Sequence, residues 1–265
     1  MKHAPVIPRF KKFSVLCLIF FSVVGTLQAQ TPHQGDQYNL EQHKLYRGQQ
    51  EAGTDPKHYL DDIKKEMRQE WPENRTINLV FHGHSVPSGY FRTPNVHTLE
   101  AYPYQLLRML KEKYPYAAIN TIVTAIGGEN SREGAARFEE QVLTHRPDVL
   151  FIDYALNDRG IAPELSRQAL ESMIKKTLKA GVKVILLSPS PDLRVDPTEP
   201  GNELEVYTRV IHDLAARYQV GLVRVYGAFG DIVKKGGHLE DYMSQVNHPN
   251  ANGHRVIAQE IFRFF

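Results

Sequence analysis

Short apolar runs alternate with longer helix-like segments along most of this chain, and that alternation most constrains the fold. The apolar runs are rich in Val, Ile and Leu and cover residues 77–81, 119–124, 149–154, 182–187 and 221–225. Helices are expected between and after them, at about 99–113, 132–144, 163–180, 202–218 and 251–264. Strands separated by helices form a parallel sheet covered on both faces. The pattern predicts an α/β fold, a three-layer α/β/α sandwich with a five-stranded parallel sheet.

The residues before this alternation divide into two parts. Residues 1–29 have a basic start, an apolar run and a small residue, Ala29, at the end, which is typical of a secretory signal peptide. An uncleaved anchor is the alternative, although the apolar run is short for a membrane span. Residues 30–75 are predicted as a polar N-terminal arm followed by a helix, and 76–265 as one globular domain. These features predict a secreted or periplasmic protein without stable membrane insertion after signal cleavage.

Composition excludes several function classes. The formal net charge is only +2 and the charges of both signs are interleaved, so no basic surface for nucleic acid is expected. Cys17, the single cysteine, lies within the predicted signal peptide. The mature chain is therefore expected to have no disulfide and no thiol nucleophile. His82, His84, His97 and His248 follow no metal-binding spacing such as HExxH, and we expect neither a metal nor a cofactor. The oligomeric state is not indicated.

Polar residues suited to acyl transfer follow the expected strands, at the carboxyl edge where such sheets bind ligands. The segments are FHGHSVPSGY (81–90), AIGGENSREG (125–134) and ALNDRG (155–160), and NHPNANGH (247–254) precedes the last expected helix. A serine hydroxyl needs an imidazole to take its proton, and the resulting oxyanion needs hydrogen-bond donors. Ser85 and His248 are the candidate nucleophile and base. Gly128 and Asn157 are the candidate oxyanion donors, with Gly127 as an alternative to Gly128.

These four blocks resemble the SGNH (GDSL-like) hydrolase family, named for a Ser, Gly, Asn and His in this order. Here they are Ser85 in GHS, Gly128 in IGGEN, Asn157 in LND and His248 in HPN, and the resemblance covers residues 76–265. It implies a flavodoxin-like sheet and hydrolysis of esters without a metal or organic cofactor. Members act on lipids, thioesters and acylated polysaccharides, so the resemblance leaves the substrate open.

Two residues depart from the family pattern. His84 stands where the first block usually has Asp, and Gln245 stands where an Asp usually orients the histidine, three residues before it. The Nδ1 hydrogen of His248 then needs another acceptor. The Gln245 amide oxygen, a main-chain carbonyl and the carboxylates of Asp241 or Glu240 are the alternatives. We therefore predict a Ser–His dyad.

Arg159 and Gln245 are candidate substrate-binding residues beside these blocks. The combined interpretation is a secreted serine esterase or deacetylase that removes acetyl or other small acyl groups from a glycan. The alternatives are a lipase-like esterase with longer acyl substrates, a glycan-binding protein without turnover, and a glycosidase. A glycosidase would need two suitably spaced carboxylates, for which Asp153, Asp158 and Glu129 are the candidates.

Overall fold

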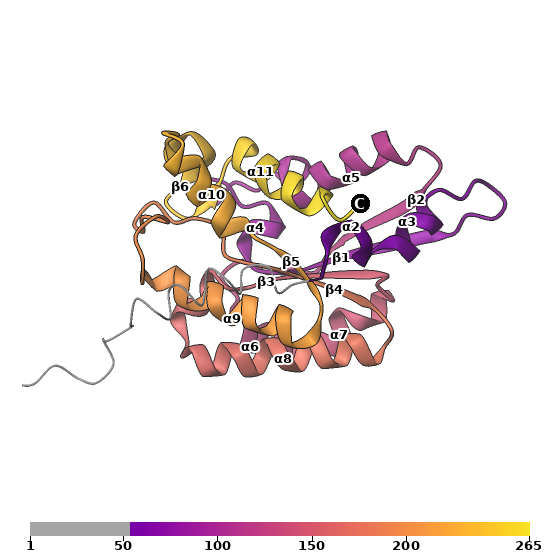
Figure 1. Ribbon diagram of the computed structural model, residues 1–265, viewed down its shortest axis with the longest axis horizontal. Coiled ribbons are helices and arrows are strands. Elements are labelled where there is room, and N and C mark those ends of the chain that lie inside the picture. Colours follow the sequence, from indigo (N-terminus) through magenta and orange to yellow (C-terminus); the bar gives the residue numbers. More distant parts are fainter. Residues whose placement is uncertain (1–53) are drawn as a thin grey trace, which may run out of the picture. The chain divides into compact units, whose positions relative to one another are not determined.

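The structure, a computed structural model, describes residues 54–265. They form a five-stranded parallel sheet in the order β2-β1-β3-β4-β5 (Figure 1). The strands are β1 (Thr76–Gly83), β2 (Ala118–Val123), β3 (Val149–Asp153), β4 (Lys183–Leu187) and β5 (Gly221–Val223). This order is that of flavodoxin-like sheets, so the expected fold class is confirmed.

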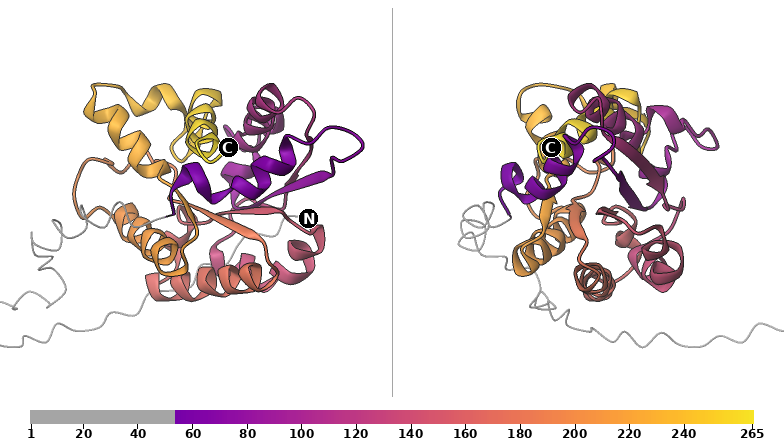
Figure 2. Two further views of the ribbon diagram at one scale, coloured as in Figure 1. Left: turned by 45° about the vertical axis from the view of Figure 1, so that its right-hand side comes forward. Right: turned by 90° about the vertical axis from the view of Figure 1, so that its right-hand side faces the viewer.

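Helices cover both faces of the sheet and make the outer layers of the sandwich (Figures 1 and 2). One layer contains α2 (Pro56–Tyr59), α3 (Asp61–Met67), α5 (Tyr102–Lys113), α10 (Val225–Lys234) and α11 (Ala251–Phe262). The other contains α6 (Ser131–Ala136), α7 (Phe138–Gln141), α8 (Pro163–Lys179) and α9 (Glu203–Tyr218). Leu79 and Phe81 of β1 pack into the first layer and Val80 into the second, because successive strand residues point to opposite faces.

One expected helix differs in detail from the structure, and one helix of the structure was not expected. The segment expected as one helix over 132–144 consists of α6, α7 and the 3₁₀ turn Leu143–His145. Helix α10 was not expected at all, because Gly227 and Gly230 lower its helix propensity. The helix stays because its apolar face is buried against the sheet, with Tyr226 and Phe229 in the core.

Strands β1 and β3 approach each other closely at their carboxyl ends, where Gly83 pairs with Asp153. A Cβ atom at Gly83 would lie 2.3 Å from the main-chain oxygen of Asp153 and 2.9 Å from Cγ of Pro87. Only glycine fits at this position. The chain then turns directly into α4 (Ser85–Ser88), which begins with the candidate nucleophile.

The predicted signal peptide and most of the predicted arm lie outside the described residues. Between residues 54 and 265, no helix combines the length and the apolar character needed to cross a bilayer. The proposed division at residue 76 stays a prediction, although β1 begins there.

Candidate active site

Ser85 is the first residue of α4, immediately after the turn that ends β1, and is largely buried. His84 caps this helix: its Nδ1 accepts a hydrogen bond from Val86 N–H at 3.2 Å. The main-chain N–H of Ser85 lies in the first turn, where helical N–H groups have no intrahelical partner. The local fold therefore presents both a hydroxyl and a free N–H donor at the carboxyl edge of the sheet.

His248 approaches Ser85 from the short strand β7 (His248–Pro249), which pairs with β6 (Met243–Gln245). Its Nε2 lies 2.9 Å from Ser85 Oγ. That distance is within hydrogen-bond reach, as proton transfer from hydroxyl to imidazole requires. The structure thus brings together two residues that the sequence separates by 163 positions.

The other ring nitrogen, His248 Nδ1, lies 2.7 Å from the main-chain oxygen of Phe91. A carbonyl can only accept, so Nδ1 carries the hydrogen and Nε2 has the free lone pair that faces Ser85. This is the tautomer that a general base needs. The sequence had left the acceptor open, and Phe91 was not named because a main-chain carbonyl has no signature in a sequence.

Gln245 also contacts the His248 ring, but with its amide nitrogen, at 2.9 Å from Nδ1. Its amide oxygen is turned away and accepts a hydrogen bond from Thr93 N–H at 3.0 Å. The amide oxygen therefore does not accept the Nδ1 hydrogen. Because Nδ1 and the amide nitrogen are both donors in this arrangement, their contact is not a hydrogen bond, and the amide hydrogens find acceptors in Thr93 Oγ1 and Asn247 Oδ1, each at 3.3 Å. Among the described residues, neither Asp241 nor Glu240 hydrogen-bonds to His248.

Burial lowers the pKa of His248 below its ordinary value, because it disfavours the charged ring. The hydrogen bond to Phe91 O acts in the opposite direction, because it stabilises the protonated ring. The net shift keeps His248 neutral, and so able to accept a proton, at neutral pH.

The candidate oxyanion donors come from the two neighbouring strands. Gly128 lies in the turn after β2 with φ of +84°, a conformation that favours glycine. Asn157 begins the 3₁₀ turn Asn157–Gly160 after β3, and its Nδ2 donates to the main-chain oxygen of Glu129 at 3.0 Å. This bond joins the two segments that carry the donors. The roles of Gly128, Gly127 and Asn157 stay predictions.

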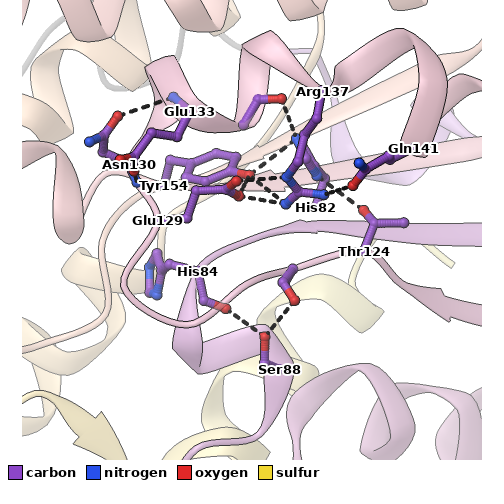
Figure 3. A network of polar contacts seen from close by, with 12 residues as sticks. His82, His84, Ser88, Thr124, Glu129, Asn130, Glu133, Arg137, Gln141 and Tyr154 are labelled. Carbon is purple, nitrogen blue, oxygen red and sulfur yellow. Dashed lines mark hydrogen bonds and ion pairs between the residues drawn. The ribbon is translucent and has the colours of Figure 1, made fainter.

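A buried network of charged and polar side chains supports the Gly128 turn (Figure 3). The Glu129 carboxylate accepts hydrogen bonds from both Arg137 Nε and Nη2 and from Tyr154 O–H. His82 Nε2 lies 3.1 Å from the same Tyr154 hydroxyl. Burial opposes ionisation of Glu129, but the bonds from Arg137 and Tyr154 outweigh it and its pKa is lowered. Burial and the Arg137 charge lower the pKa of His82 to about 4, so His82 is neutral.

A second buried group of side chains includes His84, the residue before Ser85. His84 Nε2 is 3.5 Å from Asp153 Oδ1, and Tyr102 O–H donates to Asp153 Oδ2 at 3.0 Å. These three side chains have almost no exposed surface. His84, which stands in place of the family's Asp, is thus packed behind Ser85.

Arg159 is engaged within the protein. Its guanidinium donates to Asp192 Oδ2 at 2.7 Å and to Glu203 Oε1, and its Nε donates to the main-chain oxygen of Leu156. These bonds fix the turn that contains Asn157. Its predicted contact with substrate, like that of Gln245, stays a prediction.

A serine hydroxyl hydrogen-bonded to an imidazole, with candidate oxyanion donors nearby on a parallel α/β sheet, is the arrangement of a serine-dependent acyl hydrolase. The model of the GDSL-like Lipase/Acylhydrolase family matches residues 81–256. The chain belongs to this family, and the resemblance stated from its four sequence blocks is confirmed.

Individual relatives are more distant. The chain is 31% identical to Esterase TesA of Pseudomonas aeruginosa over 118 residues, which cover 44% of this chain and 55% of that protein. It is 23% identical over 167 residues to an acetylxylan esterase of Geobacillus stearothermophilus, covering 58% and 76% of the two chains. The chain thus spans about half the length of the TesA esterase.

Solved structures share the fold. The crystal structure of the acetylxylan esterase Axe2 from Geobacillus stearothermophilus superposes with a TM-score of 0.62 at 21% identity, covering 71% of this chain and 93% of that one. A two-domain esterase active on acetylated mannans gives a TM-score of 0.63 at 21% identity, covering 80% of this chain and 53% of that one.

Proposed function

We propose that this protein is a secreted serine esterase that removes acetyl or other small acyl groups from a glycan. The observation that carries the proposal is the 2.9 Å contact between Ser85 Oγ and His248 Nε2, with the Nδ1 hydrogen directed to Phe91 O. Names of similar proteins support the substrate class, since they include an acetylxylan esterase and an esterase active on acetylated mannans.

In the first half of the reaction, His248 Nε2 takes the Ser85 proton while Oγ attacks the acyl carbonyl carbon. The main-chain N–H groups of Ser85 and Gly128 and the side-chain amide of Asn157 stabilise the oxyanion. An amide nitrogen carries two hydrogens, and one of those of Asn157 is used on Glu129 O. The other is the one we assign to the oxyanion.

Protonated His248 then donates its Nε2 hydrogen to the leaving sugar oxygen, which departs as an alcohol and leaves the acyl group on Ser85. Water attacks the acyl-enzyme with His248 again as base, and the acid is released. The Nδ1 hydrogen stays on His248 throughout and is held by Phe91 O. The dyad therefore relies on a dipole where a triad has a carboxylate.

The environment of the buried carboxylates favours an esterase over a glycosidase. Glu129 is paired with Arg137, and Asp158 accepts hydrogen bonds from Ser131 N–H and Ser166 O–H. Asp153 accepts from Tyr102 and faces His84. A glycosidase needs an acid and a second carboxylate that both reach the sugar. Because these three carboxylates are engaged by protein groups, they support the esterase proposal over the glycosidase alternative.

The test compares wild type with Ser85→Ala and His248→Ala on 4-nitrophenyl acetate, butyrate and octanoate, and on acetylated xylo- and manno-oligosaccharides. Wild type should release acetate, and each variant should lose at least about 10³-fold in kcat. Faster turnover of octanoate than acetate esters would favour the lipase-like alternative. Tight glycan binding by an inert wild type would contradict the esterase proposal and favour the binding protein.

A further inference from the structure

The Phe91 side chain lies between two histidine rings. Its ring centroid is 4.4 Å from that of His97 with an angle of 14° between the planes, and 5.3 Å from that of His254 with an angle of 12°. Both contacts are stacked arrangements at distances typical of attractive aromatic pairs. The residue whose carbonyl accepts the His248 hydrogen is therefore held on both faces of its side chain.

The inner ring of this stack is fixed by the protein core. His254 belongs to α11 and is fully buried, and its Nδ1 accepts a hydrogen bond from Tyr102 N–H at 3.2 Å. Burial lowers the pKa of His254 to about 3, so the ring is neutral under the conditions in which an esterase works. One face of Phe91 thus rests on a rigid, uncharged surface.

The His97 ring, on the solvent side of Phe91, is held by contacts within the loop from residue 89 to 101. His97 Nδ1 lies 3.1 Å from Glu100 Oε2, and its main-chain N–H donates to the carbonyl of Gly89 at 2.8 Å. The His97 side chain is 45% exposed, so it covers Phe91 from the solvent side. Phe91 itself has only 8% of its surface exposed as a result.

We propose that His97 is a positioning residue for the active site: by stacking on Phe91 it holds the Phe91 carbonyl at the Nδ1 hydrogen of His248. The proposal rests on the proposed function, since it concerns the orientation of the catalytic base. His97 itself touches neither Ser85 nor the reacting atoms.

The carbonyl needs such support because it lies in a largely exposed loop. Residues 92–100 are all exposed. Phe91 N–H donates to Asn95 O at 3.0 Å, and Thr93 N–H donates to Gln245 Oε1. Two further hydrogen bonds of the loop, Asn95 N–H to Arg92 O and His97 N–H to Gly89 O, both at 2.8 Å, do not involve the Phe91 carbonyl itself. A stacked side chain fixes the position of the Phe91 Cα, from which that carbonyl extends.

The experiment uses the full chain with two substitutions at one site, His97→Ala and His97→Phe. Alanine removes the outer ring, and phenylalanine restores a ring while still lacking the contact to Glu100. The matched control is His58→Ala, because His58 Nδ1 contacts Asp61 Oδ2 at 3.0 Å with the same three-residue spacing, on an exposed helix end. Melting temperatures establish that each variant is folded.

Two readouts are measured for each protein: the pH dependence of kcat/KM for 4-nitrophenyl acetate, and the titration of His248 by NMR. In His97→Ala we expect the maximal kcat/KM to fall about 10-fold, which is part of the rate enhancement that general base catalysis supplies. We also expect the His248 titration and the acid limb of the profile to move down by about one pH unit, because the bond to Phe91 O raises the pKa of His248. His97→Phe should restore both values, and His58→Ala should match wild type.

The outcomes separate this inference from the proposed function. If His97→Ala keeps the wild-type His248 titration and pH profile, or if His97→Phe fails to restore them, the positioning role is wrong even when Ser85-dependent turnover is present. If wild type has no Ser85-dependent turnover, the proposed function fails, while the NMR titration still decides whether His97 controls the His248–Phe91 bond. If the maximal kcat/KM of His97→Ala falls but neither the midpoint of the pH profile nor the His248 titration moves, His97 has a structural role only and the positioning role is wrong.

Discussion

His248 Nδ1 lies 2.7 Å from the carbonyl oxygen of Phe91, a residue 157 positions away in the chain. This contact gives the imidazole the orientation that an aspartate gives in a triad. A carbonyl stabilises the protonated ring less than a carboxylate does, because it carries a dipole and no net charge. The proposed dyad would therefore keep the geometry of a triad with a weaker base.

The pH profile should reflect that weaker base. Burial lowers the pKa of His248 from its ordinary value of 6.5, and only the neutral ring can accept the Ser85 proton. We therefore expect kcat/KM to rise with pH, to reach half its maximum below pH 6.5 and to stay level above neutrality. Initial rates with 4-nitrophenyl acetate between pH 4 and 8 check this. A midpoint above 6.5 would show that a negative charge stabilises the imidazolium.

Substitutions at Gln245 should separate orientation from charge. Gln245→Ala removes the contact to His248 but leaves the Phe91 bond, so we expect kcat to fall by less than about 10-fold, against about 10⁴ for loss of the aspartate function in a triad. Gln245→Asp places a carboxylate near Nδ1. It should raise the pKa of His248 and move the acid limb up by about one pH unit. Loss of all activity in Gln245→Ala would mean that Phe91 does not orient the ring.

The Glu129 network should affect both stability and rate. Glu129→Gln leaves Arg137 without its carboxylate, and we expect a loss of about 1–3 kcal/mol in the free energy of unfolding near pH 7. The Gly128 turn and Asn157 then lose support, so kcat should fall about 10-fold with little change in KM. Denaturant unfolding and initial rates measure the two effects.

The pH dependence of this stability loss has a definite sign. The folded pKa of Glu129 lies below its ordinary value of 4.5, so the stability that its ionisation contributes is present above that pH and is lost as pH falls through the folded pKa. The difference between wild type and Glu129→Gln should therefore shrink in acid. Glu133→Gln is the matched control, because Glu133 caps the adjacent helix and does not contact Arg137. An equal fall in kcat in both variants would rule out a specific role for Glu129.

The sheet could be predicted from the sequence because its strands are short apolar runs, and the central ones are buried on both faces. All five residues of β3 and the last four of β4 are buried. Strands of this kind are continuous apolar runs, which distinguishes them from surface segments in the sequence. Helix α10 could not be predicted, since Gly227 and Gly230 oppose it and only packing against the sheet stabilises it.

The candidate site was predictable only where it consists of side chains. Ser85 and His248 are recognisable because side-chain chemistry requires those residue types, and the structure places them in contact. The acceptor for His248 Nδ1 is a main-chain atom, which any residue type could supply. Neither Phe91 nor the stack around it leaves a pattern in the sequence, because it depends on the path of the loop from 89 to 101 in space.

Gly83 and His84 are adjacent in the chain but differ in how well they tolerate amino-acid substitution. A side chain at Gly83 would collide with the Asp153 main chain, so β1 and β3 would have to move apart at the end that leads into Ser85. At His84 the hydrogen bond from Val86 N–H can also be accepted by Asn, Ser or Thr, and the second requirement is a polar group that tolerates the buried Asp153 carboxylate 3.5 Å from Nε2. In a library of active variants, sequence diversity next to Ser85 should therefore occur at residue 84 and not at residue 83, which makes residue 84 the place to begin redesigning this enzyme.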